Sequence, residues 1–214
     1  DAKRHPAGPY NQAAAELMRL ADELRQAGKL DEALAACDKL LAQYGLADAA
    51  PRAAHARATI LYDAGGAKSL NQPEKAAQAL GGVLDKYGAD LLAEYALLDL
   101  GKVYEQGLKD AAKAEATYRS FDARYPQSSL AAKALVAVAR LLAEQKKYEE
   151  AILTYRKTIN KYPASDEVMT ANVGIADAYR LAGDQAKADH AHPPTCCPDH
   201  RRHGAGCVQP AASA

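Results

Sequence analysis

The feature that most constrains the fold of this chain is an internal repeat with a period of about 37 residues. The segment KKYEEAILTYRKTINKYP at 146–163 aligns with GLKDAAKAEATYRSFDARYP at 107–126. Three pairs coincide: Ala151 with Ala114, Tyr155 with Tyr118, and Pro163 with Pro126. The same alanine recurs at Ala33, Ala76 and Ala188. A tyrosine followed by glycine or proline, residues that end helices, closes four of the units: Tyr44, Tyr87, Tyr125 and Tyr162. Because repeats of this length are stable only when stacked, the chain should form an array.

Each unit is expected to contain two helices. Upstream of the repeated alanine, apolar residues recur at i, i+3, i+4 and i+7, which is one face of a helix; in the fourth unit these are Leu135, Val138, Ala139 and Leu142. The chain has no tryptophan and one phenylalanine, which favours closely packed helices over sheet. We therefore predict an all-α fold with helix pairs near 12–44, 48–87, 89–124 and 128–161, and a fifth from 166. In this register Ala151 lies at the closest helix contact of its unit, and Ala131 lies outside the packing stripe.

This pattern, with large-large-small-large on the first helix, alanine then an aromatic on the second, and a closing proline, resembles the tetratricopeptide repeat (TPR) family. The resemblance covers about residues 12–189 and implies a right-handed superhelical solenoid of antiparallel helix pairs, about five TPR-like units with the last incomplete. The second unit departs from the pattern through a longer loop before Pro73. The Tyr-Pro-x-Ser turns at 125–128 and 162–165 look like those of bacterial cell-envelope members. That likeness favours a periplasmic or cell-envelope location over the cytoplasm.

The two ends of the chain differ from the repeats. We expect residues 1–11 to be an N-terminal leader and residues 190–214 to be either a disordered tail or an anomalous, non-native stretch. This last segment holds three of the four cysteines, together with histidines and prolines. Its adjacent Cys196 and Cys197 do not match the ligand spacing of common structural zinc sites, so we predict no metal site.

No group of residues points to catalysis. His55 lacks a neighbouring nucleophile or a carboxylate at helical spacing, so a surface or partner-contacting role is expected. Cys37 replaces the tyrosine of later units on an apolar face and is expected to be a buried core thiol. The pairs Gly65-Gly66 and Gly81-Gly82 follow no strand and complete no nucleotide motif; we interpret the first as a loop and the second as a close helix contact. We expect no enzyme activity and no cofactor.

The TPR resemblance also implies a concave groove lined mainly by the first helix of each unit. Its candidate partner-binding positions are Met18, Asp22, Arg25, His55, Thr59, Tyr62, Tyr95, Lys102, Glu105, Lys133, Arg140, Glu144, Asp177 and Arg180. Matching places in successive units are held by Lys102, Arg140 and Arg180, which stacking would align into a basic ladder. The alternative is that each cation pairs with a neighbouring carboxylate such as Glu105, Glu144 or Asp177, leaving no net field.

Charge and hydropathy limit the partners. Lysine plus arginine equals aspartate plus glutamate at 27 each, so no global field attracts nucleic acid. No run approaches the roughly 18 apolar residues of a membrane-spanning helix, so direct membrane insertion is not expected. We therefore predict a protein-interaction scaffold that binds a protein or peptide segment. One alternative is a regulatory or substrate-positioning arm of a larger enzyme, and another is self-association through the open edge of the fifth unit.

Overall fold

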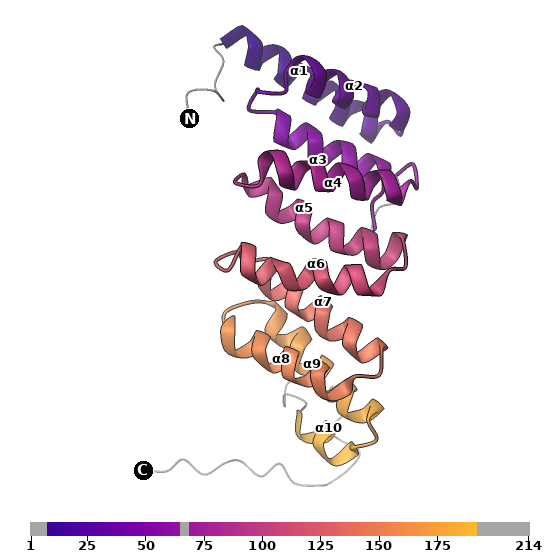
Figure 1. Cartoon of the computed structure of the whole chain (residues 1–214), viewed down its shortest axis with the longest axis vertical. Helices are drawn as coiled ribbons and strands as arrows, with labels where there is room; N and C mark the ends of the chain where they lie inside the picture. The colour runs from indigo at the N-terminus through magenta and orange to yellow at the C-terminus, as the bar shows by residue number, and fades with distance from the viewer. Residues whose placement is uncertain (1–7, 65–68, 192–214) are drawn as a thin grey trace, which may run out of the picture.

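The computed structural model describes residues 8–64 and 69–191, which form ten α-helices and one π-helix stacked along a single axis in chain order (Figure 1). The first helices of the units are α1 (Gly8–Gln26), α3 (Ala50–Leu61), α5 (Leu91–Lys102), α7 (Ala131–Glu144) and α9 (Glu167–Leu181). The second helices are α2 (Leu30–Gln43), α4 (Pro73–Tyr87), α6 (Ala111–Arg124), α8 (Tyr148–Lys161) and α10 (Gln185–Ala191). The predicted all-α fold and its helix pairs are confirmed.

One boundary differs from the prediction, and one helix has an unusual end. Helix α1 begins at Gly8, inside the segment expected to be a leader, because Tyr10 and Asn11 are tied to the next turn. The Tyr10 ring packs edge-on against Tyr44 with centroids 5.0 Å apart, and the Asn11 amide donates to Asp48. Helix α5 does not end in an ordinary turn but continues as a π-helix, η1 (Val103–Gly107). The predictions for residues 1–7, 192–214 and the Gly65-Gly66 loop lie outside the described residues.

The repeated alanine marks the closest contact between the two helices of each unit. Ala33, Ala76, Ala114 and Ala151 have no exposed surface, and Ala188 is 3% exposed. The tyrosine four residues after this alanine packs against a glycine on a first helix. This glycine is Gly101 of the same unit for Tyr118, and Gly174 of the next unit for Tyr155. A Cβ atom on Gly101 would lie 2.3 Å from the Tyr118 ring, and one on Gly174 would lie 2.3 Å from the Tyr155 ring. The backbones can approach this closely only because these positions lack a side chain.

Three packing predictions can be compared with the structure. Cys37 is buried as expected, and burial raises the pKa of its thiol to about 11. Ala131 was wrongly placed outside the packing stripe: it is fully buried in the same cluster as Ala151, because α7 is covered by α6, α8 and α9 together. The close contact expected at Gly81-Gly82 is also wrong, since a Cβ atom on either residue would meet open space.

One backbone feature recurs in the connection between the two helices in all five described units, although the connection of the second unit is longer. The residue five places before the repeated alanine always has a positive φ, at Gly28 (79°), Asn71 (53°), Lys109 (56°), Lys146 (63°) and Gly183 (85°). Glycine adopts this left-handed conformation freely, whereas a side chain makes it costly. Asparagine tolerates this conformation, so Lys109 and Lys146 are the two unfavourable residues at this position.

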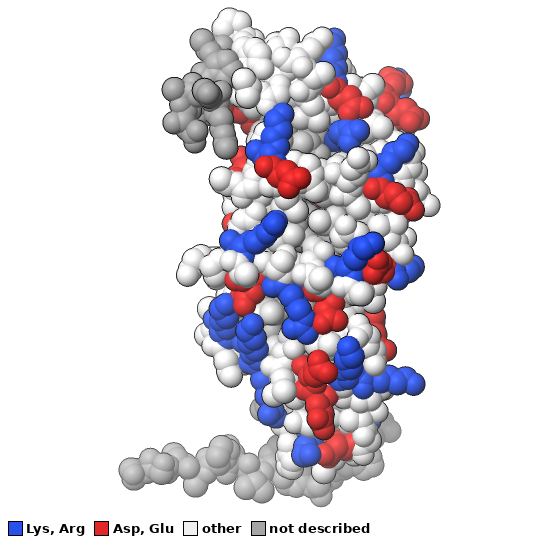
Figure 2. Space-filling model, in the orientation of Figure 1, with Lys and Arg blue, Asp and Glu red and all other residues white. Residues whose placement is uncertain are grey.

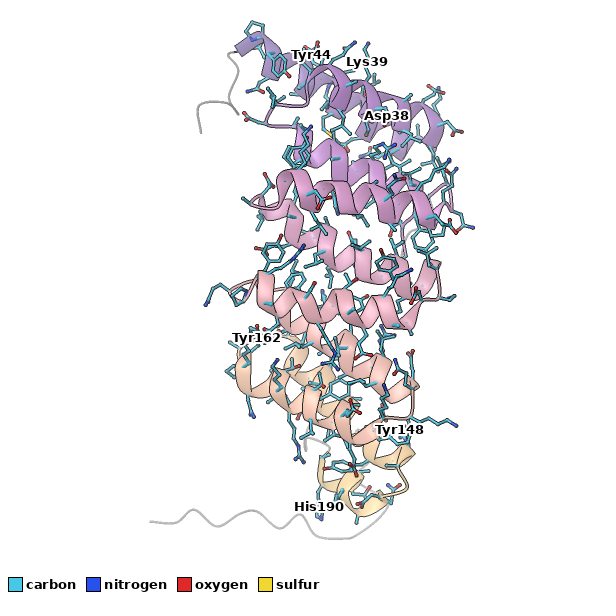
Figure 3. All side chains as sticks on the ribbon, viewed as in Figure 1. Asp38, Lys39, Tyr44, Tyr148, Tyr162 and His190 are labelled. Carbon is cyan, nitrogen blue, oxygen red and sulfur yellow. The ribbon has the colours of Figure 1, made fainter. Side chains whose placement is uncertain are left out.

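Tyrosines connect each unit to the one before it. The Tyr87 hydroxyl donates to the Gly45 carbonyl at 3.3 Å, and the Tyr125 hydroxyl donates to the Gly88 carbonyl at 3.1 Å. Each acceptor immediately follows the tyrosine of the preceding unit. The Tyr162 hydroxyl lies 3.5 Å from the Pro126 carbonyl in the same arrangement. Figure 3 shows Tyr44 and Tyr162 at the ends of α2 and α8. The repeated tyrosine thus joins units as well as ending helices.

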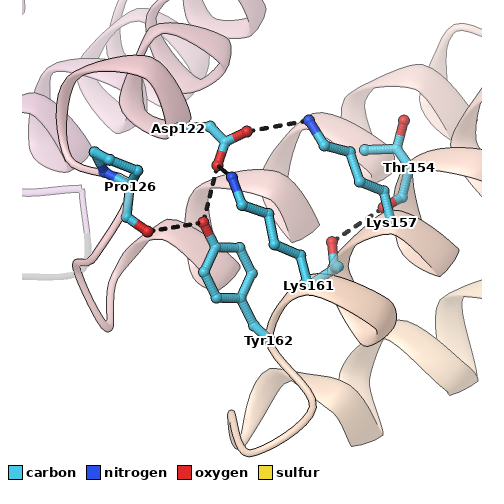
Figure 4. Close-up of polar contacts among 7 residues, drawn as sticks. Asp122, Pro126, Thr154, Lys157, Lys161 and Tyr162 are labelled. Atoms are coloured by element: carbon cyan, nitrogen blue, oxygen red, sulfur yellow. Dashed lines mark hydrogen bonds and ion pairs between the residues drawn. The ribbon is translucent and has the colours of Figure 1, made fainter.

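Asp122 on α6 makes a second set of contacts between units (Figure 4). Its carboxylate accepts hydrogen bonds from Lys157 at 3.1 Å, from Tyr162 at 2.8 Å and from Lys161. Burial opposes ionisation of this carboxyl, but the hydrogen bonds from Lys161, Tyr162 and Lys157 outweigh it and lower the pKa of Asp122 from 3.8 to about 2. Asp122 therefore links α6 to α8 as a carboxylate over the whole neutral range.

The stack bends toward the first helices. Direct packing joins α1 to α3, α3 to α5, and α7 to α9. Within the described part of the chain, no comparable packing joins successive second helices such as α4 and α6. Elements on the inner side of a bend approach each other more closely than elements on the outer side. The surface formed by α1, α3, α5, α7 and α9 is therefore the inner face, as the sequence predicts.

Candidate functional site

The candidate residues lie on the inner face with one exception. Met18 is 4% exposed and packs in the core beside Ala14 and Leu40, so its assignment to the groove is corrected. Its long unbranched side chain fills the space between α1, α2 and α3. The remaining thirteen side chains are partly or fully exposed on the first helices, on η1 or, for Tyr62, directly after α3: Asp22, Arg25, His55, Thr59, Tyr62, Tyr95, Lys102, Glu105, Lys133, Arg140, Glu144, Asp177 and Arg180.

His55 on α3 is held by a carboxylate that sequence spacing did not reveal. Its Nε2 lies 3.0 Å from Oδ2 of Asp99 on α5, and the other Asp99 oxygen accepts from Lys102 at 2.7 Å. Burial opposes ionisation of Asp99, yet the hydrogen bonds from His55 and Lys102 hold its pKa below the ordinary value. Asp99 lies 44 residues from His55 in the chain, so only the stacking of units brings the two together.

Arg140 on α7 makes a second network with η1. Its guanidinium contacts Glu105 at 2.6 Å and Glu144 at 3.2 Å. Glu105 also accepts from the Tyr118 hydroxyl at 3.0 Å and is only 10% exposed. Burial, and then the adjacent Glu105 charge, raise the pKa of the Tyr118 hydroxyl, so it stays a neutral donor. Glu105 is therefore fixed between two partners and cannot swing out to meet a ligand.

The proposed basic ladder is thus neutralised, and the alternative based on local pairing is correct. Lys102 pairs with Asp99, Arg140 with Glu105 and Glu144, and Arg180 with Asp177 at 2.6 Å. The sequence analysis identified the carboxylates that pair with Arg140 and Arg180, but not Asp99, which pairs with Lys102. Positive and negative side chains are likewise interspersed on the face seen in Figure 2. Steering by a large single-sign field is not how this surface works.

Between α5 and α7 the inner face is hollowed by a pocket of ≈ 280 Å³, called here the seam pocket. Its lining is Leu98, Lys102, Glu105, Gln106, Tyr118, Lys133, Val136, Ala137, Arg140 and Glu167. The apolar part of this lining comes from α5 and α7, and the charged part surrounds it. Leu98, Val136, Ala137 and Glu167 were not among the predicted residues. Leu98 and Val136 continue the helical stripes that contain Tyr95 and Lys133, so the same periodicity could have identified them.

A second and larger hollow of ≈ 740 Å³, the turn pocket, lies between the loops that follow α6 and α8. Residues from 126–133 and 161–167 line it, including Pro126, Ser129 and Tyr162. Two residues, Lys133 and Glu167, line both the turn pocket and the seam pocket. The two hollows are therefore adjacent at these side chains, beside the N-terminal part of α7, and are together called the groove.

The inner face offers chemistry suited to contact with a polypeptide. In residues 8–64 and 69–191 no three His, Cys, Asp or Glu side chains lie close enough to hold a metal ion. Over the same residues, no helix has the length and apolar character needed to cross a bilayer. The groove combines an apolar floor with charges that are mostly paired. Such a surface can hold a polypeptide segment by side-chain burial and by a few oriented polar contacts.

Comparisons with known proteins agree with this geometry. A family model described as tetratricopeptide repeat matches residues 95–128 and 133–165, the third and fourth units. A comparison with curated protein sequences finds no match. The crystal structure of MamA protein superposes with a TM-score of 0.63 at 19% identity, over 83% of this chain and 87% of that one.

Two further solved structures have the same fold. MamA from Desulfovibrio magneticus RS-1 gives a TM-score of 0.61 at 14% identity, covering 87% of this chain and 93% of that one. YrrB, described as a TPR protein with an unusual peptide-binding site, gives 0.57 at 17% identity, over 87% and 90% of the two chains. At these identities the likeness concerns the fold. Together with the family match, it supports the TPR assignment and the solenoid architecture.

Proposed function

We propose that this protein is a non-catalytic scaffold that binds an extended segment of a protein partner in the groove formed by the seam pocket and the turn pocket. The observation that carries the proposal is that the two hollows are adjacent and share Lys133 and Glu167 in their linings. Adjacent hollows with an apolar floor suit a chain segment that places successive side chains into them. The YrrB structure, whose description names a peptide-binding site, supports this kind of use for the fold.

Rigidity is the mechanism of this binding. The groove is built on packed helices, and its charged side chains are held in place by Asp99, Glu105 and Glu144 before any partner arrives. A preformed surface loses little conformational entropy when it binds, so more of the contact energy appears as affinity. Lys102, Glu105 and Arg140 already have partners, and their main effect is to discriminate against segments that would bury an unpaired charge.

As part of the same proposal, we assign this scaffold to bacterial cell-envelope assembly because its Tyr-Pro-x-Ser turns look like those of cell-envelope members. These turns form much of the turn pocket, and the hydroxyl oxygens of Ser128 and Ser165 accept hydrogen bonds from the backbone amides of Leu130 and Glu167. The cellular location can be tested by fractionating source cells that carry a tagged copy of the gene. Recovery of the tagged protein in the cytoplasmic fraction alone would contradict the envelope assignment.

Site-specific photo-crosslinking in the source cell tests the scaffold proposal. A photoreactive amino acid would replace Gln106 in the seam pocket or Ser129 in the turn pocket, both exposed side chains. Matched controls would carry it at Lys75 on α4 or Leu153 on α8, which are exposed on second helices. We expect both groove positions to capture the same protein and the controls to miss it. Capture of that protein from all four positions, or from neither groove position, would refute the proposal.

A further inference from the structure

The seam pocket arises where the repeat is irregular. From the small residue of the first helix to the buried alanine of the second, the distance is twelve residues in units one, four and five, as between Ala139 and Ala151. In the third unit, Gly101 to Ala114 is thirteen. The third unit therefore contains one inserted residue, and the insertion falls in the stretch that forms η1. A π-helix is the usual way in which a helix absorbs a single extra residue, often at functional sites.

Backbone hydrogen bonds show the insertion directly. Where the second helix begins, the amides of Lys29, Lys147 and Asp184 each donate at 2.9 Å to the carbonyl five residues earlier. The equivalent amide in the third unit, Asp110, donates at 2.8 Å to Tyr104, which is six residues earlier. The extra residue is therefore contained within the end of the first helix, and the start of the second helix stays in its normal place.

The insertion changes how α5 meets its neighbour. Other first helices pack directly on the next one, but among the described residues packing between α5 and α7 is at most marginal. The contact is made instead by Glu105 of η1, which reaches Arg140 on α7 and is fixed by Tyr118 on α6. The ion pair between Glu105 and Arg140 therefore bridges η1 and α7, and the seam pocket lies beside it.

The size and lining of the seam pocket define what it can hold. At ≈ 280 Å³ it is smaller than most pockets that enclose a whole small molecule, which span roughly 300–1,000 Å³. Its apolar wall consists of Leu98, Val136 and Ala137, with Leu98 and Val136 under 10% exposed. One large aliphatic or aromatic side chain of an extended segment matches this space and this chemistry.

The charged residues at the entrance of the seam pocket determine which residues can flank the buried side chain in the ligand. Lys102 and Arg140 are already paired within the protein. In the described part of the chain, Lys133 and Glu167 have no ion-pair partner, and they do not pair with each other although both line the same junction. An extended ligand that crosses this junction therefore meets one unsatisfied cation and one unsatisfied carboxylate.

We infer that the seam pocket is a specificity pocket created by the one-residue insertion, and that it selects an extended peptide carrying a large apolar side chain flanked by an acidic and a basic residue. The acidic residue pairs with Lys133 and the basic one with Glu167. This inference rests on the proposed function, since it names the kind of segment that the groove accepts. It predicts that the third unit, rather than the regular units, decides which partner binds.

Panning a phage library of random twelve-residue peptides against the full chain tests the inference, with binding of the enriched synthetic peptides measured by fluorescence anisotropy. Two variants remove the pocket by different routes. Deletion of Gln106 restores the regular spacing, and Val136→Phe fills the pocket from its wall. Either change should weaken binding about 10- to 100-fold, the equivalent of one large buried side chain. Leu153→Phe on the outer helix α8 is the matched control and should leave binding unchanged.

The contribution of the charged residues at the pocket entrance is tested with a separate variant. Lys133→Glu should weaken peptides with the acidic flank by about threefold to tenfold and should restore binding when that flank is made basic. Lys39→Glu on α2, labelled in Figure 3, is the control. Circular dichroism of each variant checks that helicity is retained, and Val136→Phe decides the outcome if the deletion does not fold.

Two different failures can be distinguished with a photoreactive residue at Ser129. Peptides that crosslink from this position but bind the Val136→Phe variant as well as the parent would overturn the specificity pocket while leaving the groove in place. Enriched peptides without the apolar residue and its charged flanks would overturn it too. If no enriched peptide crosslinks from Ser129, both the inference and the proposed function are wrong.

Discussion

Gly101 and Gly82 offer the sharpest test of how the helices pack, because the same substitution should have opposite effects at the two positions. Both lie within helices, where replacing glycine by alanine gains about 1 kcal/mol of helix propensity. Gly82 on α4 is exposed, and a Cβ atom there meets open space. Gly82→Ala should therefore stabilise the protein by nearly that full amount.

At Gly101 the added methyl group meets the Tyr118 ring. Its Cβ would lie 2.3, 2.6 and 2.7 Å from three ring atoms of a side chain that is only 2% exposed. Overpacking of this kind costs about 1–3 kcal/mol. Displacing the ring also disturbs the hydrogen bond from Tyr118 to the Glu105 carboxylate, which is worth about 1.5–3 kcal/mol. After subtracting the gain in helix propensity, Gly101→Ala should destabilise the protein by about 1.5–5 kcal/mol.

Thermal unfolding followed by circular dichroism measures both variants. For a chain of this size each kcal/mol corresponds to roughly 2–4 °C, so the melting temperature should rise by about that much for Gly82→Ala and fall by roughly 3–20 °C for Gly101→Ala. Adding Tyr118→Leu to Gly101→Ala should cost less than the sum of the two single changes, since the ring causes the clash. Two glycine variants that shift the melting temperature in the same direction would refute the reasoning.

Ala151→Leu should lower the free energy of unfolding by about 1–3 kcal/mol, and Ala131→Leu should do the same because both alanines are fully buried. An unchanged melting midpoint for either would contradict the packing described here. Lys146→Gly should raise stability by about 0.5–1 kcal/mol in denaturant titrations, because it relieves the positive φ of 63°, whereas Lys147→Gly at the neighbouring position should not. For Asp122, the lowered pKa means that its contribution to stability is complete above about pH 4 and is lost as pH falls toward 2. The difference in melting temperature between the parent and Asp122→Asn should therefore be constant near neutral pH and shrink in acid; a constant difference down to pH 2 would argue against the Asp122 contacts.

The helices and their pairing could be predicted because the signals for them are local and repeated. An alanine at a fixed period and a tyrosine before glycine or proline locate each second helix within a few residues. The prediction for Ala131 was wrong because burial at the start of α7 depends on three other helices at once. A stripe on one helix cannot show that its opposite side is covered as well.

The site was less predictable because its key contacts join distant units. Most of the charged positions on the inner face follow from helical spacing, but the pairing of His55 with Asp99 depends on how α3 stacks on α5. The seam pocket depends on a shift of one residue, which was present in the sequence as unequal spacings of 38 between Gly101 and Ala139 and 37 between Ala114 and Ala151. Only the backbone shows that this difference becomes a π-helix and not a longer loop.

The tyrosine hydrogen bonds between units give the stack a direction. Each hydroxyl reaches back to a carbonyl made earlier in the chain, as Tyr87 does to Gly45 and Tyr125 to Gly88. Shortening the protein from its C-terminal side would leave a turn carbonyl that water can satisfy, whereas shortening it from the N-terminal side would leave a tyrosine hydroxyl without its partner. During synthesis the acceptor is always in place before the donor emerges from the ribosome. The array can therefore be extended unit by unit in the order in which the ribosome makes it, each new pair of helices locking onto a finished surface.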